Sequence, residues 1–243
     1  MSMVQMRNRV VTASFVWTGA AVFALSLGWF LYSYLIRFGR PVAGGADPLV
    51  VLVNVALFTA FAAHHSALAR SGIKSALRRH VPPGIERSLY TWTASLLFIA
   101  VCAFWRPVPG MWYELHGVWA IAGYGAQALG LALTARGGAA VDALDLAGVR
   151  PMLHAAHGSE PRHVPLETRG LYGFVRHPLY FAWALFVFGA PVMTATRGTF
   201  AVVSTLYLML AIPWEERSLV EVFGERYEEY RRRVRWRMIP FIY

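Results

Sequence analysis

The chain has 243 residues, of which 57% are hydrophobic and 15% are charged, and its formal net charge is +10 at pH 7. A soluble domain carries about 25% charged residues, so this composition argues against a soluble globular protein. In a soluble protein the positive charge would indicate nucleic acid. Here the basic residues lie between and after long apolar segments, so membrane topology explains them and no nucleic-acid partner is expected.

Six apolar segments are predicted to cross a lipid bilayer, since a helix needs about 20 apolar residues to do so. In chain order they are residues 10–36, 48–68, 88–104, 117–135, 179–196 and 199–214. The first is longer than the ~7–15 apolar residues of a signal peptide, so we expect it to be retained. The last two are separated only by Arg197 and Gly198, which predicts a tight helical hairpin whose outer ends return to one membrane face.

The basic residues are distributed unequally about these spans. With six spans, 19 of the 23 Lys and Arg lie on one side. The positive-inside rule then places both termini in the cytoplasm, in a bacterial inner or cytoplasmic membrane. No repeat or Gly/Ser linker divides the chain. We therefore predict one domain, with four spans in residues 1–136, a cytoplasmic loop in 137–177 and a hairpin with a C-terminal helix in 178–243.

The segment after the last span is predicted to form an amphipathic cytoplasmic helix. Its apolar residues recur at spacings of three and four, and they are Leu219, Phe223, Tyr227, Tyr230 and Val234. Gly224 interrupts this helix at a cost of about 1 kcal/mol relative to Ala, which suggests close packing there. The expected fold is an all-α polytopic membrane bundle of about six transmembrane helices followed by this helix.

Two polar clusters bracket the predicted hairpin, and its turn should bring them together. Pro178 suits the first position of a helix, with His177 as its cap, so the first-turn N–H groups and Arg176 are expected to form an anion site. Glu215 and Glu216 would stand on the opposite wall and accept hydrogen bonds from hydroxyl or ammonium groups. Aromatic walls would come from Tyr172, Tyr180, Trp183 and Tyr227. Such a pocket matches the parts of S-adenosylmethionine, which combines a carboxylate, hydroxyls and a sulfonium that aromatic rings attract.

Five strings in the last third of the chain carry a family resemblance. They are GLY at 170–172, RHPLY at 176–180, EERSL at 215–219, FGERYEEY at 223–230 and RMIP at 237–240. In order, spacing and residue type they resemble the signature of the isoprenylcysteine carboxyl methyltransferase and phospholipid methyltransferase superfamily. The resemblance implies a methyltransferase that holds S-adenosylmethionine in a cytoplasmic pocket and admits a lipophilic acceptor from the bilayer.

This resemblance also implies which residues form the site. The cofactor-binding residues would be Tyr172, Arg176, His177, Pro178, Tyr180, Glu215, Glu216 and Tyr227. Arg176 and Glu216 would also take part in catalysis, which is mostly alignment of the acceptor with the donor's methyl group.

The N-terminal half carries a second resemblance, in AHHSALAR at 63–70, ERSLY at 86–90 and DALDL at 142–146. These strings are similar to the superfamily branch that contains methanethiol S-methyltransferases and membrane proteins linked to nitrite and nitric oxide reduction, although His64 stands where Gln is commoner. The branch favours a small thiol as acceptor, with prenylcysteine carboxylate and phospholipid amine as alternatives. A thiol must become a thiolate, for which His64, His65, Arg87 or Arg176 are candidates, and His65 and Arg87 are the predicted catalytic pair from this half.

A non-enzymatic membrane protein is the alternative to the enzyme. The chain could be a transporter or a respiratory-complex assembly factor that keeps the hairpin as a scaffold. A transporter should show internal symmetry and a charged site in the middle of the membrane, whereas this chain concentrates charge at one face. No metal site is expected, because His154, His157 and His163 lack regular spacing and nearby Cys.

Overall fold

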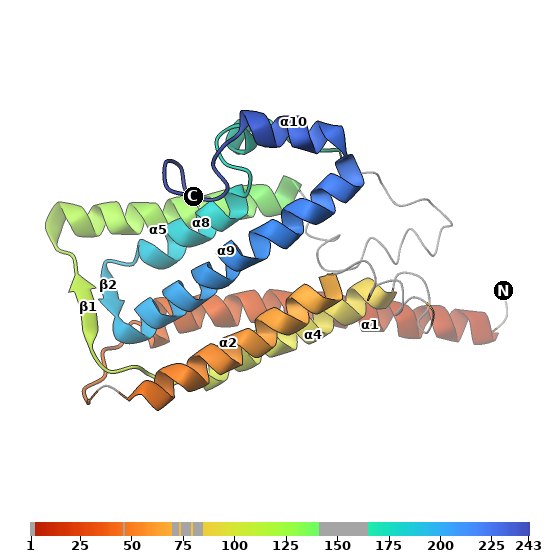
Figure 1. The fold of residues 1–243 in the computed structure, drawn as a ribbon. Helices are drawn as coiled ribbons and strands as arrows, with labels where there is room; N and C mark the ends of the chain where they lie inside the picture. The colour runs from red at the N-terminus through yellow and green to blue at the C-terminus, as the bar shows by residue number, and fades with distance from the viewer. Residues whose placement is uncertain (1–2, 46, 70–72, 74–78, 80–84, 141–164) are drawn as a thin grey trace. The chain divides into compact units, whose positions relative to one another are not determined.

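The computed structural model describes residues 3–45, 47–69, 73, 79, 85–140 and 165–243. The described chain is mostly helical, with one two-stranded antiparallel sheet, and it divides into two compact units. The helices and strands of each unit can be followed along the chain in Figure 1. His154, His157 and His163, which are not expected to form a metal site, lie outside the described residues, and so does the 142–146 string.

The first unit consists of helices from the N-terminal half. They are α1 (Met3–Tyr32), its π-helical extension η1 (Ser33–Arg37), α2 (Pro48–Ala69) and α4 (Ile85–Phe104). Helices α1 and α4 pack closely, because Gly19 leaves room for the ring of Trp92, whose indole N–H donates to the Phe15 carbonyl at 2.9 Å. At the other end, Arg37 donates to the carbonyls of Cys102, Ala103 and Trp105 and so fixes the end of α4.

The second unit holds the C-terminal half. Its elements are β1 (Met111–Glu114), α5 (Gly117–Ala140), the 3-10 turn η2 (Gly170–Gly173), α8 (Pro178–Phe188), β2 (Val192–Thr194), α9 (Ala195–Phe223) and α10 (Glu225–Arg233). Helix α5 lies against α8 through Gly130 and Gly137, and Gly123, seven residues before Gly130, faces Gly189 and Pro191 just after α8. A methyl group on Gly130 would lie 2.6 Å from the Ala182 carbonyl oxygen, so this contact needs a residue without a side chain.

The α8–α9 hairpin exists, but its turn is not at Arg197 and Gly198 as predicted. Helix α8 ends at Gly189 and Pro191 cannot continue it, so the chain reverses through β2, which pairs with β1. The Thr194 hydroxyl then accepts from the backbone N–H of Arg197 at 3.1 Å and caps α9. Arg197 and Gly198 therefore belong to the buried first turns of α9.

The lengths of the two arms explain how the hairpin closes. At 1.5 Å per residue α8 is about 16 Å long, and the stretch from Ala190 to Thr194 adds up to about 17 Å. On the other arm, α9 rises about 32 Å between Ala195 and Glu216. The start of α8 is thus brought level with Glu216, although the two helices differ in length.

Helix α9 also continues further than expected, because Trp214, Glu215 and Glu216 lie within it and not after it. It ends at Gly224, whose φ of 57° is in the left-handed region. A methyl group on Gly224 would meet no atom within 4 Å, so the predicted close packing is wrong and backbone conformation is the reason for glycine. Helix α10 follows and buries Tyr227 and Tyr230.

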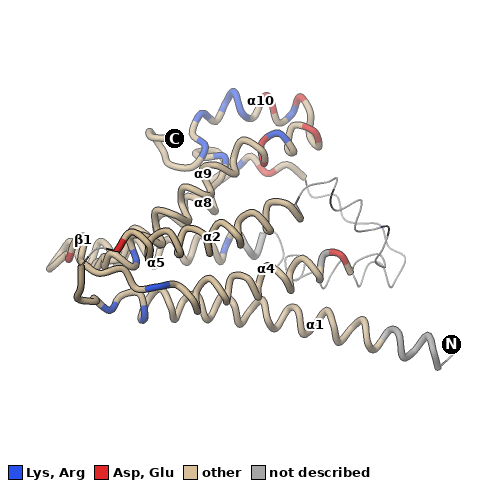
Figure 2. The backbone as a smooth tube through the Cα atoms, turned by 60° about the horizontal axis from the view of Figure 1, so that its bottom comes forward, with Lys and Arg blue, Asp and Glu red and all other residues tan. Residues whose placement is uncertain are grey.

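Among the described residues, four helices are long and apolar enough to cross a membrane, in the stretches Val10–Arg37, Pro48–Leu68, Gly117–Gly137 and Ala195–Phe223. The apolar helices Ser88–Phe104 and Pro178–Phe188 are shorter, so the count of six spans stays a prediction. Large apolar side chains remain uncovered on α5, where Val118 is 69% and Trp119 70% exposed. Figure 2 shows few charged residues along the long helices and many on α10. This arrangement is typical of an integral membrane protein.

Candidate functional site

The two polar clusters predicted to meet are in direct contact in the second unit. The Nε of Arg176 donates to Oε1 of Glu216 at 2.7 Å, and both side chains are 5% exposed. The Nη1 of Arg176 also donates to the carbonyls of Val234 and Arg235, at 2.7 and 2.9 Å. Arg176 and Glu216 were expected on opposite walls of a pocket, and here the structure differs, because the pair bonds directly.

His177 lies between the two acids. Its Nε2 is 3.3 Å from Oε1 of Glu216 and its Nδ1 is 3.5 Å from Oε2 of Glu215. Burial acts to lower the pKa of His177, but the hydrogen bonds and charges of the two glutamates outweigh it and hold the pKa above its ordinary value. The His177 imidazole therefore binds its proton more tightly than a free histidine does.

Pro178 and Tyr180 complete this side of the cluster. As predicted, His177 is the N-cap of α8 and Pro178 its first residue, although the His177 side chain makes no capping hydrogen bond. The Tyr180 ring stacks on His177 at 5.3 Å, and its hydroxyl donates to Oε2 of Glu215 at 2.8 Å. The Glu215 side chain is 46% exposed, so it offers a carboxylate to solvent while Glu216 is buried.

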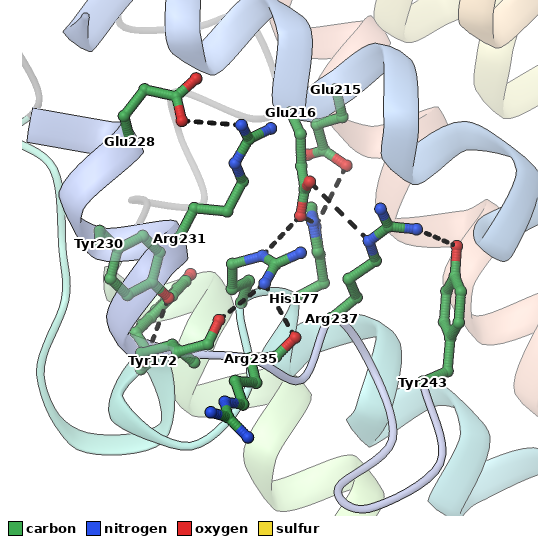
Figure 3. A network of polar contacts seen from close by, with 12 residues as sticks. Tyr172, His177, Glu215, Glu216, Glu228, Tyr230, Arg231, Arg235, Arg237 and Tyr243 are labelled. Carbon is green, nitrogen blue, oxygen red and sulfur yellow. Dashed lines mark hydrogen bonds and ion pairs between the residues drawn. The ribbon is translucent and has the colours of Figure 1, made fainter. Parts of the chain in front are cut away.

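The segment after α10 returns beside the start of α8. Val175 pairs with Trp236 as an isolated parallel bridge, and the backbone N–H of His177 donates to the Arg237 carbonyl at 2.8 Å. As a result the Arg237 side chain reaches Glu216, with 4.0 Å between Nε and Oε2 (Figure 3). The sequence motif included Arg237, but its role could not be inferred from spacing alone.

Three tyrosines pack together beside this cluster. The Tyr230 hydroxyl donates to the Tyr172 carbonyl at 2.8 Å (Figure 3). Tyr172 packs against the buried cluster that contains Tyr227 and Tyr230. Tyr227 is 1% exposed, and its hydroxyl has no hydrogen-bond partner among the described residues. Burial, together with the charge of Glu216, raises the pKa of Tyr227 to about 12, so the hydroxyl stays protonated and can donate.

A shallow pocket of about 180 Å³ opens next to these tyrosines. Its lining consists of Leu166, Thr168, Arg226, Glu229, Tyr230 and Arg233. Small-molecule sites usually enclose about 300–1,000 Å³, so this pocket is too small for a nucleoside-sized ligand.

The two predicted catalytic residues from the N-terminal half belong to the first unit. His65 contacts Tyr90, whose hydroxyl lies 2.8 Å from Nδ1 of the imidazole. The neighbouring His64 has a buried Nδ1 without a partner among the described residues. Arg87 lies in α4, but its side chain is outside the described residues. The part of His65 and Arg87 in chemistry stays a prediction.

Comparison with known proteins places these motifs in a family. No family model and no solved structure matches the chain. It is 35% identical over 184 residues to methanethiol S-methyltransferase 2 of Bradyrhizobium diazoefficiens, covering 76% of this chain and 71% of that protein. It is 36% identical over 193 residues to methanethiol S-methyltransferase of Crocosphaera subtropica, covering 79% and 75%. Protein-S-isoprenylcysteine O-methyltransferase B of Arabidopsis thaliana is 34% identical over 88 residues, covering 35% and 45%.

These relatives agree with the motif resemblance in the last third of the chain and with its apolar helices. Identity above 30% extends over more than two thirds of both chains for the two bacterial proteins. The chain therefore belongs to the isoprenylcysteine carboxyl methyltransferase-like superfamily of membrane methyltransferases.

Proposed function

We propose that this protein is an S-adenosylmethionine-dependent methyltransferase of the bacterial inner membrane that methylates a small thiol, with methanethiol as the favoured acceptor. The observation that carries the proposal is the buried contact of Arg176 and His177 with Glu216, at 2.7 and 3.3 Å, which unites the two halves of the family motif. The acceptor is suggested by the bacterial relatives, which are named for methanethiol.

The side chains around this contact suit the parts of that cofactor. The exposed carboxylate of Glu215 can accept from a ribose hydroxyl. The hydroxyl of Tyr227 has no partner among the described residues and can donate to a bound ligand. The stacked rings of His177 and Tyr180 offer a flat surface to a purine. When bound, the cofactor supplies a methyl group activated on a positively charged sulfur. The protein's own contribution is to hold the cofactor, to align it with the acceptor and to exclude water.

The acceptor thiol needs to lose its proton, because the thiolate is the nucleophile and a free thiol has a pKa of about 8.5. His64 and His65 are candidates for this step, with Arg87 as a cation that stabilises the thiolate. A prenylcysteine carboxylate or a phospholipid amine would use the same donor site with a different acceptor cavity.

The topology belongs to the same proposal. The four long apolar helices and the shorter α4 and α8 make six spans, with both termini and α10 at the cytoplasmic face. The two units then act as one methyltransferase domain, in which the α8–α9 hairpin and the C-terminal segment hold the donor.

Methyl transfer by purified protein in lipid nanodiscs tests the proposal. Methyl-labelled S-adenosylmethionine is offered with methanethiol, a farnesylcysteine analogue or phosphatidylethanolamine, and labelled dimethyl sulfide is the expected product. Glu215→Gln should lower the rate at least tenfold, whereas Glu221→Gln, an exposed position on the same helix, should not. Label in another product class would show that a small thiol is not the acceptor. Absence of transfer to any acceptor would overturn the proposed activity.

A further inference from the structure

Arg176 has few free donors for a ligand. A guanidinium carries five N–H groups, and Arg176 directs three hydrogen bonds to Glu216 and to the carbonyls of Val234 and Arg235. The residue is 8% exposed. Its hydrogen bonds join the segment after α10 to α9 and balance the charge of Glu216.

Arg237, in contrast, is partly exposed and has donors left for a ligand. Its side chain is 39% exposed, and Nε lies 4.0 Å from Oε2 of Glu216. Its Nη1 donates to the Tyr243 hydroxyl at 3.1 Å, and the guanidinium carbon lies 5.3 Å from the centre of the Tyr243 ring. Figure 3 shows the side chain between Glu216 and Tyr243. Nη2 has no hydrogen-bond partner among the described residues, so this cation is positioned but still has donors for a ligand.

The backbone of Arg237 is also fixed. Its carbonyl accepts from the N–H of His177 at 2.8 Å, and the carbonyl of Trp236 accepts from the N–H of Arg176 at 2.9 Å. The Tyr243 carbonyl accepts from the N–H groups of Met238 and Ile239 and closes the loop that follows. An arginine held in this way loses less conformational entropy when it binds a carboxylate.

We infer that Arg237, and not Arg176, binds the carboxylate at the amino-acid end of the methyl donor. The inference rests on the proposed function, since it needs a donor with an amino-acid end. An arginine next to Glu216 complements a zwitterion, because Arg237 can bind the carboxylate through two N–H groups while the negative charge of Glu216 attracts the ammonium group.

Binding to the purified protein tests this inference without measuring turnover. S-adenosylhomocysteine and its decarboxylated analogue differ only in the carboxylate, and calorimetry gives the affinity of each. The unmodified protein should prefer S-adenosylhomocysteine by about 10- to 100-fold, as expected for hydrogen bonds to a charged group. Arg237→Gln should abolish that preference by weakening S-adenosylhomocysteine alone, and Arg237→Lys should retain part of it.

Arg232→Gln is the matched control, because it removes an equal charge from an exposed position on α10. It should keep the preference, and all variants should keep the melting temperature of the unmodified protein. If Arg237→Gln weakens both ligands equally, or neither, the inference is wrong and Arg237 has at most a structural part. If the unmodified protein binds S-adenosylhomocysteine without preferring it to the analogue, the inference alone fails. If it binds neither ligand, the proposed function itself fails.

Discussion

Arg176 and Glu216 are separated by 40 positions in the chain, yet Nε of the arginine lies 2.7 Å from Oε1 of the glutamate. Both side chains are buried, so each charge has lost most of its hydration and depends on the other. The contact also joins the start of α8 to the C-terminal part of α9, so it stabilises the fold as well as forming the candidate site.

Removal of one partner should therefore lower the stability of the fold. Glu216→Ala leaves a buried guanidinium without its acid, and we expect the free energy of unfolding to fall by about 3 kcal/mol. Glu221→Ala, on the exposed surface of the same helix, should change it by less than about 0.5 kcal/mol. Chemical unfolding in detergent, followed by circular dichroism, measures both values.

The double variant Arg176→Met with Glu216→Leu separates stability from activity. Apolar residues of similar volume remove the unpaired charge, so this variant should recover part of the stability lost in Glu216→Ala. The recovery stays incomplete because the Val234 and Arg235 carbonyls lose their donor. It should remain inactive, because the polar cluster is gone. Equal stability of Glu216→Ala and the unmodified protein would show that the pair is not held as the structure shows it.

The raised pKa of His177 predicts how stability depends on pH. A group whose pKa is higher in the folded chain binds its proton more tightly there, so its contribution is fully present below the unfolded pKa of about 6.5 and is lost as pH rises through the folded value. His177→Gln removes this contribution. The difference in melting temperature between the unmodified protein and His177→Gln should be largest near pH 6 and should shrink toward pH 9. A difference that grows with pH would contradict the pairing of His177 with the two glutamates.

The glycines of α5 allow a test of helix packing with a control in the same helix. Gly130→Ala places a methyl group against the Ala182 carbonyl and the Phe186 backbone, and overpacking of this kind costs about 1–3 kcal/mol. Gly125 has no neighbour within 4 Å, so Gly125→Ala should leave stability unchanged or raise it by up to about 1 kcal/mol. Unfolding of both variants in the same detergent gives the comparison. Similar effects at the two positions would argue against close contact of α5 with α8.

Local patterns in the sequence were enough to predict most of the helices and the meeting of the two polar clusters. Pro178 indicates a helix start, and the apolar stretch between His177 and Glu215 is long enough for one reversal of direction. The family motif also included Arg237 in the C-terminal segment, which lies beside Glu216 in the structure. Each of these signals lies within a few residues of the feature that it predicts.

The features that were missed depend on contacts between distant residues. The turn of the hairpin is set by pairing of β1 with β2 and by the Thr194 cap, and neither shows as a break in hydropathy. Gly189 and Pro191 were the local signals that could have found it. Likewise, the sequence cannot tell which of Arg176 and Arg237 donates to backbone carbonyls, because those carbonyls belong to the segment that folds back after α10.

The tyrosines of α10 offer a last comparison, between one hydroxyl with a partner and one without. Tyr227→Phe removes a buried hydroxyl that makes no hydrogen bond among the described residues, so stability should stay the same or rise by about 1 kcal/mol. Tyr230→Phe removes the bond to the Tyr172 carbonyl and should lower stability by about 1 kcal/mol. If the Tyr227 hydroxyl donates to the bound cofactor, Tyr227→Phe should also weaken S-adenosylhomocysteine about tenfold. Calorimetry and unfolding of the same preparations separate the two effects, and a Tyr227→Phe variant that loses stability but keeps its affinity would assign this hydroxyl to the fold and not to the ligand.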